Sequence, residues 1–299
     1  MQQNQEINGV IVIDKPKEMT SHDVVAIMRR KLKTKKIGHT GTLDPMATGV
    51  LPICIGRATK IVDFLLENSK GYACEMKLGE ATDTQDRWGT VTEKSEKIEV
   101  TEAEIIEVIK SFEGDIFQIP PMYSALKING EKLVDLARKG IIVEREARKR
   151  TIYKIDNIVV RQHTISFEVI CSKGTYIRTL CHDIGVKLGC FAHMTELRRT
   201  MSDPFYLRDA VELESLELDT ASAHLITIES SLSFMNAVTV PNTTKYAKLI
   251  ENGVKVNLES FFSENDLKNA QKFYRIYLGE AFCGIGEKTE KGLFMKKRF

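Results

Sequence analysis

The sequence predicts a mixed α+β protein with a largely antiparallel central sheet flanked by helices, followed by a small C-terminal β domain. Runs of β-branched or alternating apolar residues are interleaved with stretches of helical spacing in no regular order, as in α+β folds. The 299 residues suffice for one large domain and one small one. From about residue 235 the chain changes to short strand-like runs, glycine turns and the basic end KKRF. We therefore expect one domain over residues 1–234 and a second over 235–299.

Strand signals recur along the first domain. The run NGVIVID is rich in β-branched residues, and in GYACEMKLG apolar and polar residues alternate, which is typical of a strand buried on one face. The same alternation returns in the last third of this domain. We expect these strands over residues 8–14, 71–79 and 151–171.

Helical spacing of apolar residues predicts four helices. The first has Thr20 or Ser21 as its N-cap, and its last turns carry the basic run RRKLKTKK, where cations meet the negative end of the helix dipole. The third begins with a capping box formed by Thr101 and Glu104. In the fourth, Arg178 lies one residue off the apolar row and can point away from it. The helices cover about residues 21–36, 58–66, 101–112 and 177–188.

Two segments between these elements are interpreted as loops. The stretch over residues 38–60 is rich in glycine and threonine, and the second helix closes it. The run QIPPMYSALKINGEKLVDLARKG contains two adjacent prolines, a turn at Gly130 and a short helix stopped by Gly140. We expect this second segment to project from the core over about residues 118–150.

The distribution of charge is more informative than its sum. Lys and Arg exceed Asp and Glu by only two, so the net charge does not indicate a nucleic-acid partner. Basic residues gather at 29–36, at 145–150 and at the C-terminus, whereas acids gather at 93–107 and 212–219. Such segregation favours one basic face directed at a polyanion. Each run taken singly is also typical of a solvated helix face or loop.

Several classes of protein are disfavoured. No run of about 18 apolar residues offers a membrane span, and the polar start MQQNQE lacks the order of a secretion signal, so we expect a cytoplasmic protein. The six cysteines show no CxxC pairs, which favours reduced, mostly buried thiols. The spacing of the closest candidate metal cluster matches no familiar zinc pattern, and no metal is expected. That cluster is Cys181, His182, Cys190 and His193.

The stretch GHTGTLDPMATGVLPICIGRATK holds a single acid, Asp44. Because Pro45 restricts Asp44 to an extended conformation, the turn can hold a carboxylate rigidly at the floor of a cleft. From this stretch alone, the more ordinary interpretation is that Asp44 is a turn residue that bonds nearby backbone amides. If the fold brought Arg178 and Tyr72 beside it, the arginine would orient the carboxylate and the tyrosine would offer a face for a nucleobase. A surface arginine and a core-edge tyrosine are the ordinary alternatives.

This same stretch closely resembles the catalytic motif of the bacterial TruB-type tRNA pseudouridine synthases, which isomerise a uridine in the T-loop of tRNA. The resemblance extends in order through IDKPKEMTSHDVV, KGYACEMKLGEATDTQDRWG, QIPPMYSALKINGEKLVDLARKG, GTYIRTLCHDIGVKLG and MTELRRT. The C-terminal segment is similar to the RNA-binding PUA domain. The resemblance covers most of the chain and implies the pseudouridine synthase fold, a tRNA T-stem-loop as substrate, and a monomer that needs no cofactor.

The resemblance also implies roles for individual residues. It makes Asp44 the catalytic aspartate, Tyr72 the tyrosine that stacks on the target base, and Arg178 the basic partner of the aspartate. His39 matches the histidine that helps to extrude the target nucleotide, and Leu197 aligns with an apolar residue of the pocket.

Lys15 and Pro16 fall on the N-terminal KP motif that supports the active site, and we group them with the substrate-binding residues. Glu18 departs from the family pattern, because it stands where that motif usually has glycine. The substitution brings the local loop conformation into question, since a non-glycine residue adopts a positive φ with difficulty. Val134 replaces a frequent tyrosine farther along the chain.

The implied reaction cleaves a C1′–N1 glycosidic bond, turns the uracil and rejoins it through C5. Asp44 would act by covalent addition or by assisting elimination at the sugar, and both routes stay open. Tyr72 is a candidate for accepting the C5 proton, although the usual tyrosine pKa near 10 makes stacking its better role.

Two other functions compete with this one. The first is a non-catalytic RNA-binding or RNA-folding protein with the same fold. The second is a glycosidase with paired carboxylates, which would need Asp83 or Asp86 beside Asp44.

Overall fold

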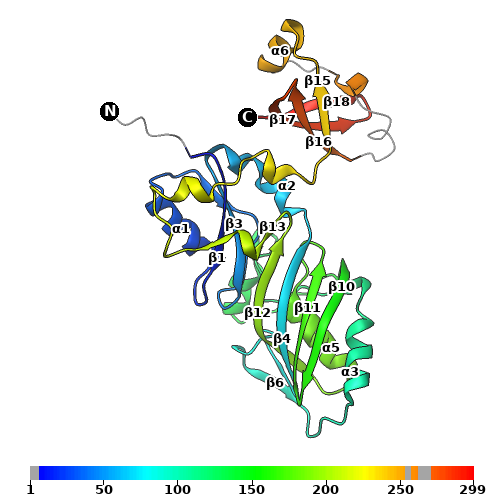
Figure 1. The fold of residues 1–299 in the computed structure, drawn as a ribbon. Coiled ribbons are helices and arrows are strands. Elements are labelled where there is room, and N and C mark those ends of the chain that lie inside the picture. Colours follow the sequence, from blue (N-terminus) through cyan, green and yellow to red (C-terminus); the bar gives the residue numbers. More distant parts are fainter. Residues whose placement is uncertain (1–6, 253–256, 262–270) are drawn as a thin grey trace.

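The computed structural model describes residues 7–252, 257–261 and 271–299 (Figure 1). Among these residues the main feature is a ten-stranded sheet whose pairings are antiparallel except for two, β1 with β14 and β3 with β12. Eight of its strands are neighbours in the order β14 (Ala210–Glu212), β1 (Gly9–Lys15), β3 (Thr48–Ile55), β12 (Ala192–Ser202), β4 (Lys70–Leu78), β11 (Thr164–Cys171), β10 (Arg148–Arg161) and β7 (Gly114–Gln118). The other two, β2 (Ile37–His39) and β13 (Phe205–Tyr206), pair with β3 and β12. The prediction of a largely antiparallel central sheet is confirmed.

The helices begin where local capping chemistry places them. The predicted capping box of Thr101 with Glu104 starts the third helix. Thr20, one of the two expected N-caps, starts the first helix and forms a further capping box with Asp23. Figure 1 shows α1 beside β1, and α3 and α5 beside β10 and β11. The helices are α1 (Ser21–Lys31), α2 (Val62–Leu66), α3 (Glu102–Lys110), α4 (Leu133–Arg138), α5 (Ile177–Lys187) and α6 (Thr244–Glu251).

The prediction of a loop over residues 38–60 is wrong for most of its length. β2 (Ile37–His39) and β3 lie within this stretch, and β3 occupies a central place in the sheet between β1 and β12. Pro52 and the glycines argued against a strand, but Pro52 pairs with Val12 in a strand that is almost wholly buried. Burial of the apolar run therefore outweighs the local signals. The helix expected over 58–66 starts as a 3₁₀ helix, Gly56–Ile61, and continues as α2.

Two connections carry small hairpins. β5 (Glu80–Thr82) pairs with β6 (Val91–Lys94) around the loop over residues 83–90. Between the edge strand β7 and its partner β10, residues 119–147 form the inserted segment, which contains β8 (Lys127–Ile128), β9 (Glu131–Lys132) and α4. The predicted turn at Gly130 joins β8 to β9, and the short helix ends just before Gly140, where φ is +73°.

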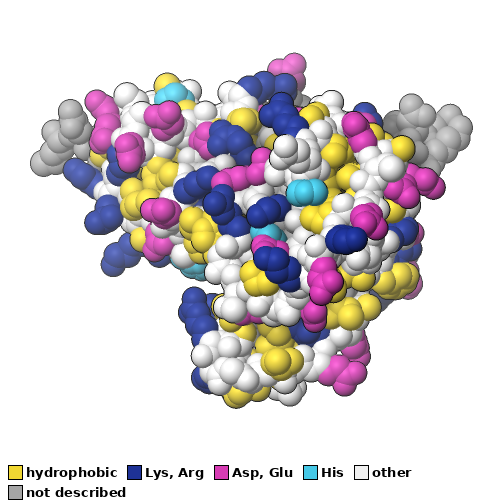
Figure 2. Space-filling model, turned by 90° about the horizontal axis from the view of Figure 1, so that it is seen from below, with side chains coloured by type: hydrophobic (Ala, Val, Ile, Leu, Met, Phe, Trp, Pro, Cys, Tyr) yellow, Lys and Arg dark blue, Asp and Glu magenta, His cyan; other side chains and the backbone are white. Residues whose placement is uncertain are grey.

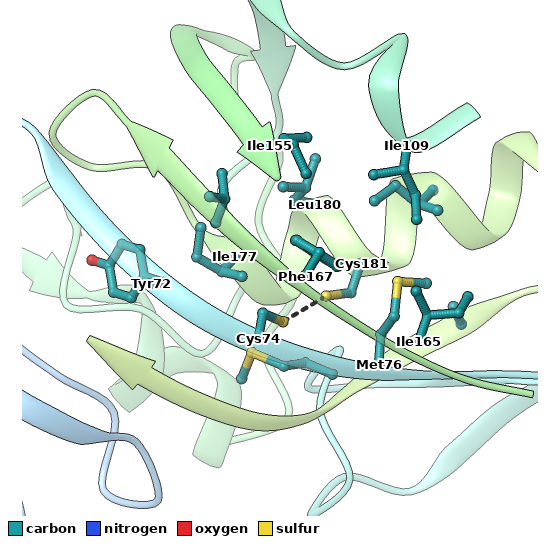
Figure 3. Close-up of a cluster of buried hydrophobic side chains, with 14 of the residues drawn as sticks. Tyr72, Cys74, Met76, Ile109, Ile155, Ile165, Phe167, Ile177, Leu180 and Cys181 are labelled. Atoms are coloured by element: carbon teal, nitrogen blue, oxygen red, sulfur yellow. Dashed lines mark hydrogen bonds between the residues drawn. The ribbon is translucent and has the colours of Figure 1, made fainter. Parts of the chain in front are cut away.

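The largest buried cluster fills the space between the sheet and two helices (Figure 3). It is formed by side chains from β4, β11, β10, α3 and α5, and full burial of one such apolar side chain contributes about 1.5–3 kcal/mol. The Sγ atoms of Cys74 and Cys181 lie 3.4 Å apart inside it, and both thiols are free. Ile177, Leu180 and Ile184 of α5 point inward as predicted.

The small C-terminal β domain packs on the first domain near α2 (Figure 1). The rings of Phe64 and Phe273 meet edge to face at 4.9 Å, and Ile285 joins a buried cluster with residues of β1 and β3. Its four strands, in sheet order, are β15 (Ala237–Val240), β16 (Phe273–Leu278), β17 (Ala281–Thr289) and β18 (Gly292–Arg298). In the first domain, β13 (Phe205–Tyr206) pairs with β12.

Candidate active site

Asp44 and Arg178 meet, although 134 positions separate them in the chain. Asp44 lies in the loop over residues 40–47, which we call the Asp44 loop, between β2 and β3. Arg178 is the second residue of α5, and its Nη2 atom lies 3.4 Å from Oδ1 of Asp44. The arginine side chain is 6% exposed and the aspartate 39%, so a buried cation holds a carboxylate that is open to solvent.

The guanidinium of Arg178 has two further partners, which fix its position. Nη2 donates to the backbone oxygen of Tyr123 at 2.6 Å, and Nη1 lies 3.9 Å from Oδ2 of Asp86. The carboxylate of Asp86 also accepts from Thr84 Oγ1 at 2.6 Å and from the Trp88 amide at 3.1 Å. Arg178 therefore connects the Asp44 loop, the 83–90 loop and the inserted segment.

Asp86 is a residue that the sequence had suggested only for a glycosidase. The structure places it against the same arginine as Asp44, buried and engaged with its own loop. Its Oδ1 accepts from two donors of its own loop and its Oδ2 faces Arg178, so neither oxygen is left free to serve as a general acid towards a substrate. The geometry therefore disfavours the paired-carboxylate glycosidase.

Lys15 holds the Asp44 loop through hydrogen bonds from its buried side chain. Its side chain is fully buried, and Nζ donates to the backbone oxygens of Pro16 at 2.8 Å, Met19 at 2.6 Å and Pro45 at 3.0 Å. Burial lowers the pKa of Lys15 from 10.5 to about 8, and the nearby Asp44 carboxylate opposes this shift. Because all three N–H groups bind backbone oxygens, Lys15 supports the loop rather than reaching a substrate.

The KP motif continues through Pro16, which is exposed, to the unusual Glu18. Glu18 adopts φ +62°, in the left-handed region where the family has glycine. The turn keeps its shape nevertheless, because Met19 N donates to Pro45 O at 3.3 Å and Ser21 Oγ accepts from Leu43 N at 2.9 Å.

His39 is held in β2 as a neutral side chain. Its Nδ1 accepts from the Gly41 amide at 3.3 Å, so the ring proton is on Nε2. Burial is the main cause that lowers the pKa of His39 from 6.5 to about 4, and the neighbouring His22 and Arg199 contribute to the same shift. The rings of His22 and His39 meet edge to face at 5.3 Å.

Tyr72 and Leu197 share one buried cluster with Leu43 and Ala47 of the Asp44 loop. Burial raises the pKa of Tyr72 to about 12, although the Arg199 guanidinium opposes this shift. The phenol therefore keeps its proton at neutral pH. The structure thus brings Tyr72 and Leu197 against the Asp44 loop, which Arg178 and Lys15 also contact. His39 lies in β2, which leads into this loop.

Arg199 is a component that the sequence reasoning missed. It is 1% exposed, stands opposite Tyr72 in the pairing of β12 with β4, and donates through Nε to Val50 O at 2.7 Å and through Nη2 to Gly41 O at 3.2 Å. A buried guanidinium must satisfy its N–H groups, and here it does so by joining β3 and the Asp44 loop to β12. Its position in ELRRT, two residues after Leu197, was the signal that could have identified it.

Within the described part of the chain, no three His, Cys, Asp or Glu side chains gather as a metal site requires. Of the four residues weighed as a cluster, Cys181 contacts Cys74, and His193 Nδ1 lies 2.9 Å from Glu80 O. No helix among the described residues is both long and apolar enough to cross a membrane.

The fold has solved counterparts. The chain superposes on a chain of a Cbf5-Nop10-Gar1 complex with a TM-score of 0.75 and 28% identity, covering 99% of this chain and 85% of that one. For an H/ACA RNP bound to a substrate RNA containing 2′-deoxyuridine, the TM-score is 0.70 and the identity 27%, covering 97% and 84%. The fold, with a carboxylate and an arginine at its site, is that of the pseudouridine synthases.

Sequence comparisons define the family within that class. Residues 29–177 match the N-terminal domain of the TruB family of pseudouridylate synthases, and residues 178–232 match the C-terminal domain of tRNA pseudouridylate synthase B. tRNA pseudouridine synthase B of Clostridium perfringens (strain SM101) is 49% identical over 97% of this chain and 98% of its own. That of Clostridium tetani is 46% identical over 97% and 99%. The chain belongs to the TruB family.

Proposed function

We propose that this protein is a tRNA pseudouridine synthase that converts uridine-55 in the T-loop to pseudouridine. The observation that carries the proposal is the contact between Arg178 and Asp44 at 3.4 Å on a TruB-family fold. Full-length similarity to proteins named tRNA pseudouridine synthase B supports the reaction and the substrate.

Asp44 is the catalytic residue of this proposal. It is the partly exposed member of its pair, so its carboxylate is able to reach the ribose or the base of a bound nucleotide. Arg178 stays buried and keeps the carboxylate oriented through either covalent addition or assisted elimination. No cofactor enters either route, because the glycosidic bond is broken and remade within one nucleoside.

Base extrusion falls to three other side chains. A base inside the folded loop must leave its stack, which costs a few kcal/mol. His39, neutral at pH 7, enters the vacated space without the cost of burying a charge. Tyr72 offers its ring to the flipped base, and Leu197 closes the pocket. A pKa of about 12 makes Tyr72 a stacking residue first and a proton acceptor second.

RNA affinity is assigned to basic surface outside the site. The candidates are residues 29–36, the segment 118–150 with its basic run 145–150, and a PUA-like domain over 235–299 attached to a catalytic domain over 1–234. A hollow of about 620 Å³ in the inserted segment is lined partly by Lys127, Lys132, Arg138 and Lys139. Figure 2 shows Lys and Arg spread over one face with Asp and Glu among them, so phosphate contacts on that face are local rather than spread over a uniformly basic surface.

A tRNA-modifying enzyme works where tRNA is, so we propose a cytoplasmic location. We also propose that the protein is a monomer and binds no metal. A purely RNA-folding protein would not need Asp44 and Arg178, and their contact favours catalysis over that alternative.

The test is incubation of the purified protein with an unmodified T-stem-loop RNA, followed by mapping of pseudouridine at single-nucleotide resolution. We expect one modified position, corresponding to uridine-55. A matched RNA with cytidine at that position serves as the control. Absence of pseudouridine, or its formation only elsewhere in the loop, would overturn the proposal.

A further inference from the structure

An ion-paired cluster lies beside the site. Glu196, which precedes the pocket residue Leu197 on β12, holds Lys17 with Oε2 2.6 Å from Nζ. Its other oxygen, Oε1, lies 3.2 Å from Nη1 of Arg87. Lys17 follows the KP motif and Arg87 lies in the 83–90 loop, so one carboxylate gathers cations from two loops that border the site. All three side chains are between about a third and a half exposed.

Trp88 extends this cluster with a flat aromatic face. It is the only tryptophan of the sequence and is 43% exposed, although indole rings usually gain by burial. The guanidinium carbon of Arg87 lies 5.7 Å from the centroid of its ring.

The 83–90 loop presents Trp88 rigidly. The Trp88 amide donates to Asp86 Oδ1, and the Thr90 amide donates to Asp83 Oδ1 at 2.8 Å. A Cβ on Gly89 would lie 2.3 Å from Thr84 Oγ1, so the turn is closely packed. Both acids of the loop thus have hydrogen-bond partners within it.

The loop is tied directly to the proposed catalytic pair. Asp86 lies two residues before Trp88 and faces Arg178, which in turn faces Asp44. Arg87 N also donates to Met194 O at 2.9 Å, which fixes the loop to β12. Trp88 is therefore linked to Asp44 through only two intervening side chains, those of Asp86 and Arg178.

We propose that Lys17, Arg87 and Trp88 form an auxiliary binding site for an unpaired nucleotide adjacent to the target uridine. The inference rests on the proposed function. Trp88 stacks on the base, and Lys17 and Arg87 bind its phosphate, which replaces the carboxylate of Glu196. Exposed ion pairs are weak, so this exchange costs little, whereas a phosphate between two cations and a base on an indole ring are the usual elements of single-strand recognition.

The single tryptophan makes the test direct. The intrinsic emission of the wild-type protein is followed while unmodified T-stem-loop RNA is added, and binding is measured in parallel by filter retention. Stacking of a base on Trp88 predicts quenching that saturates with binding. Trp88→Ala should raise KM about tenfold and leave kcat unchanged, and Trp88→Phe should stay within about threefold of wild type. Tyr206→Ala is the matched control, because Tyr206 forms a similar pair with Arg208 at 4.5 Å on β13.

The outcomes separate this inference from the proposed function. If wild type forms pseudouridine but its emission is unchanged at saturating RNA, or if Trp88→Ala keeps the wild-type KM, the auxiliary site is wrong and the enzyme assignment stands. If wild type binds the RNA but forms no pseudouridine, the enzyme assignment fails. A KM for Trp88→Phe as high as that of Trp88→Ala would also contradict stacking, because phenylalanine keeps an aromatic face.

Discussion

The Asp44 loop and the inserted segment both reach Arg178, but they are built in opposite ways. Buried donors hold the Asp44 loop, notably Lys15 and Arg199, and apolar residues surround it. The inserted segment contacts Arg178 through one backbone oxygen, and it leaves Ile141 45% and Ile142 82% exposed. The difference teaches that the proposed catalytic group is placed on rigid backbone, while the proposed RNA-binding element has few contacts of its own to hold it.

Two glycines show the same contrast. Gly49 closes the Asp44 loop at the start of β3 with φ +100°, and a Cβ there would lie 2.2 Å from Arg199 O. Gly130 of the inserted segment has φ +87°, and a Cβ there would meet nothing within 4 Å. The two glycines therefore have similar backbone conformations, but Gly49 is closely packed and Gly130 is open to solvent.

The largest loss of activity is expected from a substitution of Asp44, in the rigid Asp44 loop. Asp44→Asn keeps the size of the side chain but removes its charge, and pseudouridine formation should fall by about 10³-fold or more. RNA binding and unfolding should change little, because Asp44 is partly exposed and its long contact with Arg178 contributes little to stability.

The assay is single-turnover pseudouridine formation with enzyme in excess. Asp63→Asn, at an exposed acid of α2, is the control for a general loss of charge. Activity within tenfold of wild type in Asp44→Asn would place the chemistry elsewhere.

The glycine pair tests the contrast in rigidity itself. Gly49→Ala forces Cβ into the backbone of β12, and we expect the free energy of unfolding to fall by about 3–5 kcal/mol. Gly130→Ala should lower the free energy of unfolding by only about 1 kcal/mol, because the alanine must adopt a left-handed backbone conformation but meets no neighbour. Urea unfolding of the two variants, monitored by circular dichroism, gives the comparison. Equal losses would mean that the two regions are equally constrained.

The histidine of the rigid region gives a dependence on pH. The pKa of His39 is about 4 in the folded protein and 6.5 in its ordinary state, so between these values the unfolded chain binds a proton that the folded one does not. The contribution of neutral His39 to stability is therefore complete above pH 6.5 and declines as the pH falls towards 4. After allowance for partial exposure, the loss is about 1–2 kcal/mol.

Urea unfolding at pH 7 and at pH 4.5 measures this loss. His39→Gln should lose less stability over that interval than wild type, whereas His224→Gln, at an exposed histidine, should follow wild type. If wild type and His39→Gln decline in parallel, His39 does not titrate as described.

Much of the fold followed from local signals in the sequence. Three local signals predicted elements that the structure confirms: an N-cap at Thr20 or Ser21, a capping box at Thr101, and alternation in the segment that forms β4. The failure was β3, because Pro52 and the flanking glycines are loop signals, whereas its place between β1 and β12 depends on pairing with distant residues. Long-range burial of this kind is not encoded in any short window.

The site shows the same division. Asp44, Tyr72 and Arg178 were suggested by resemblance, but their proximity depends on β4 and α5 enclosing one buried cluster, which spacing alone does not reveal. Arg199 escaped attention because a buried arginine among strand residues is identified only by its acceptors, Val50 O and Gly41 O. The roles of these residues in the reaction stay predictions.

The smallest effect is expected at Glu18, where the sequence departs from its family. Its φ of +62° costs about 1 kcal/mol relative to glycine. Glycine would also raise the conformational entropy of the unfolded chain, which lowers the free energy of unfolding by a similar amount. Glu18→Gly should therefore change the free energy of unfolding by less than about 0.5 kcal/mol and leave pseudouridine formation at the wild-type rate. Urea unfolding and the T-stem-loop assay measure both quantities.

The turn that contains Glu18 is already fixed by Lys15 and by the hydrogen bond from Met19 N to Pro45 O, so glycine at position 18 should not change its conformation. A large change in rate would show that the rigid support of Asp44 depends on residue 18 itself, and not on the buried lysine beneath it.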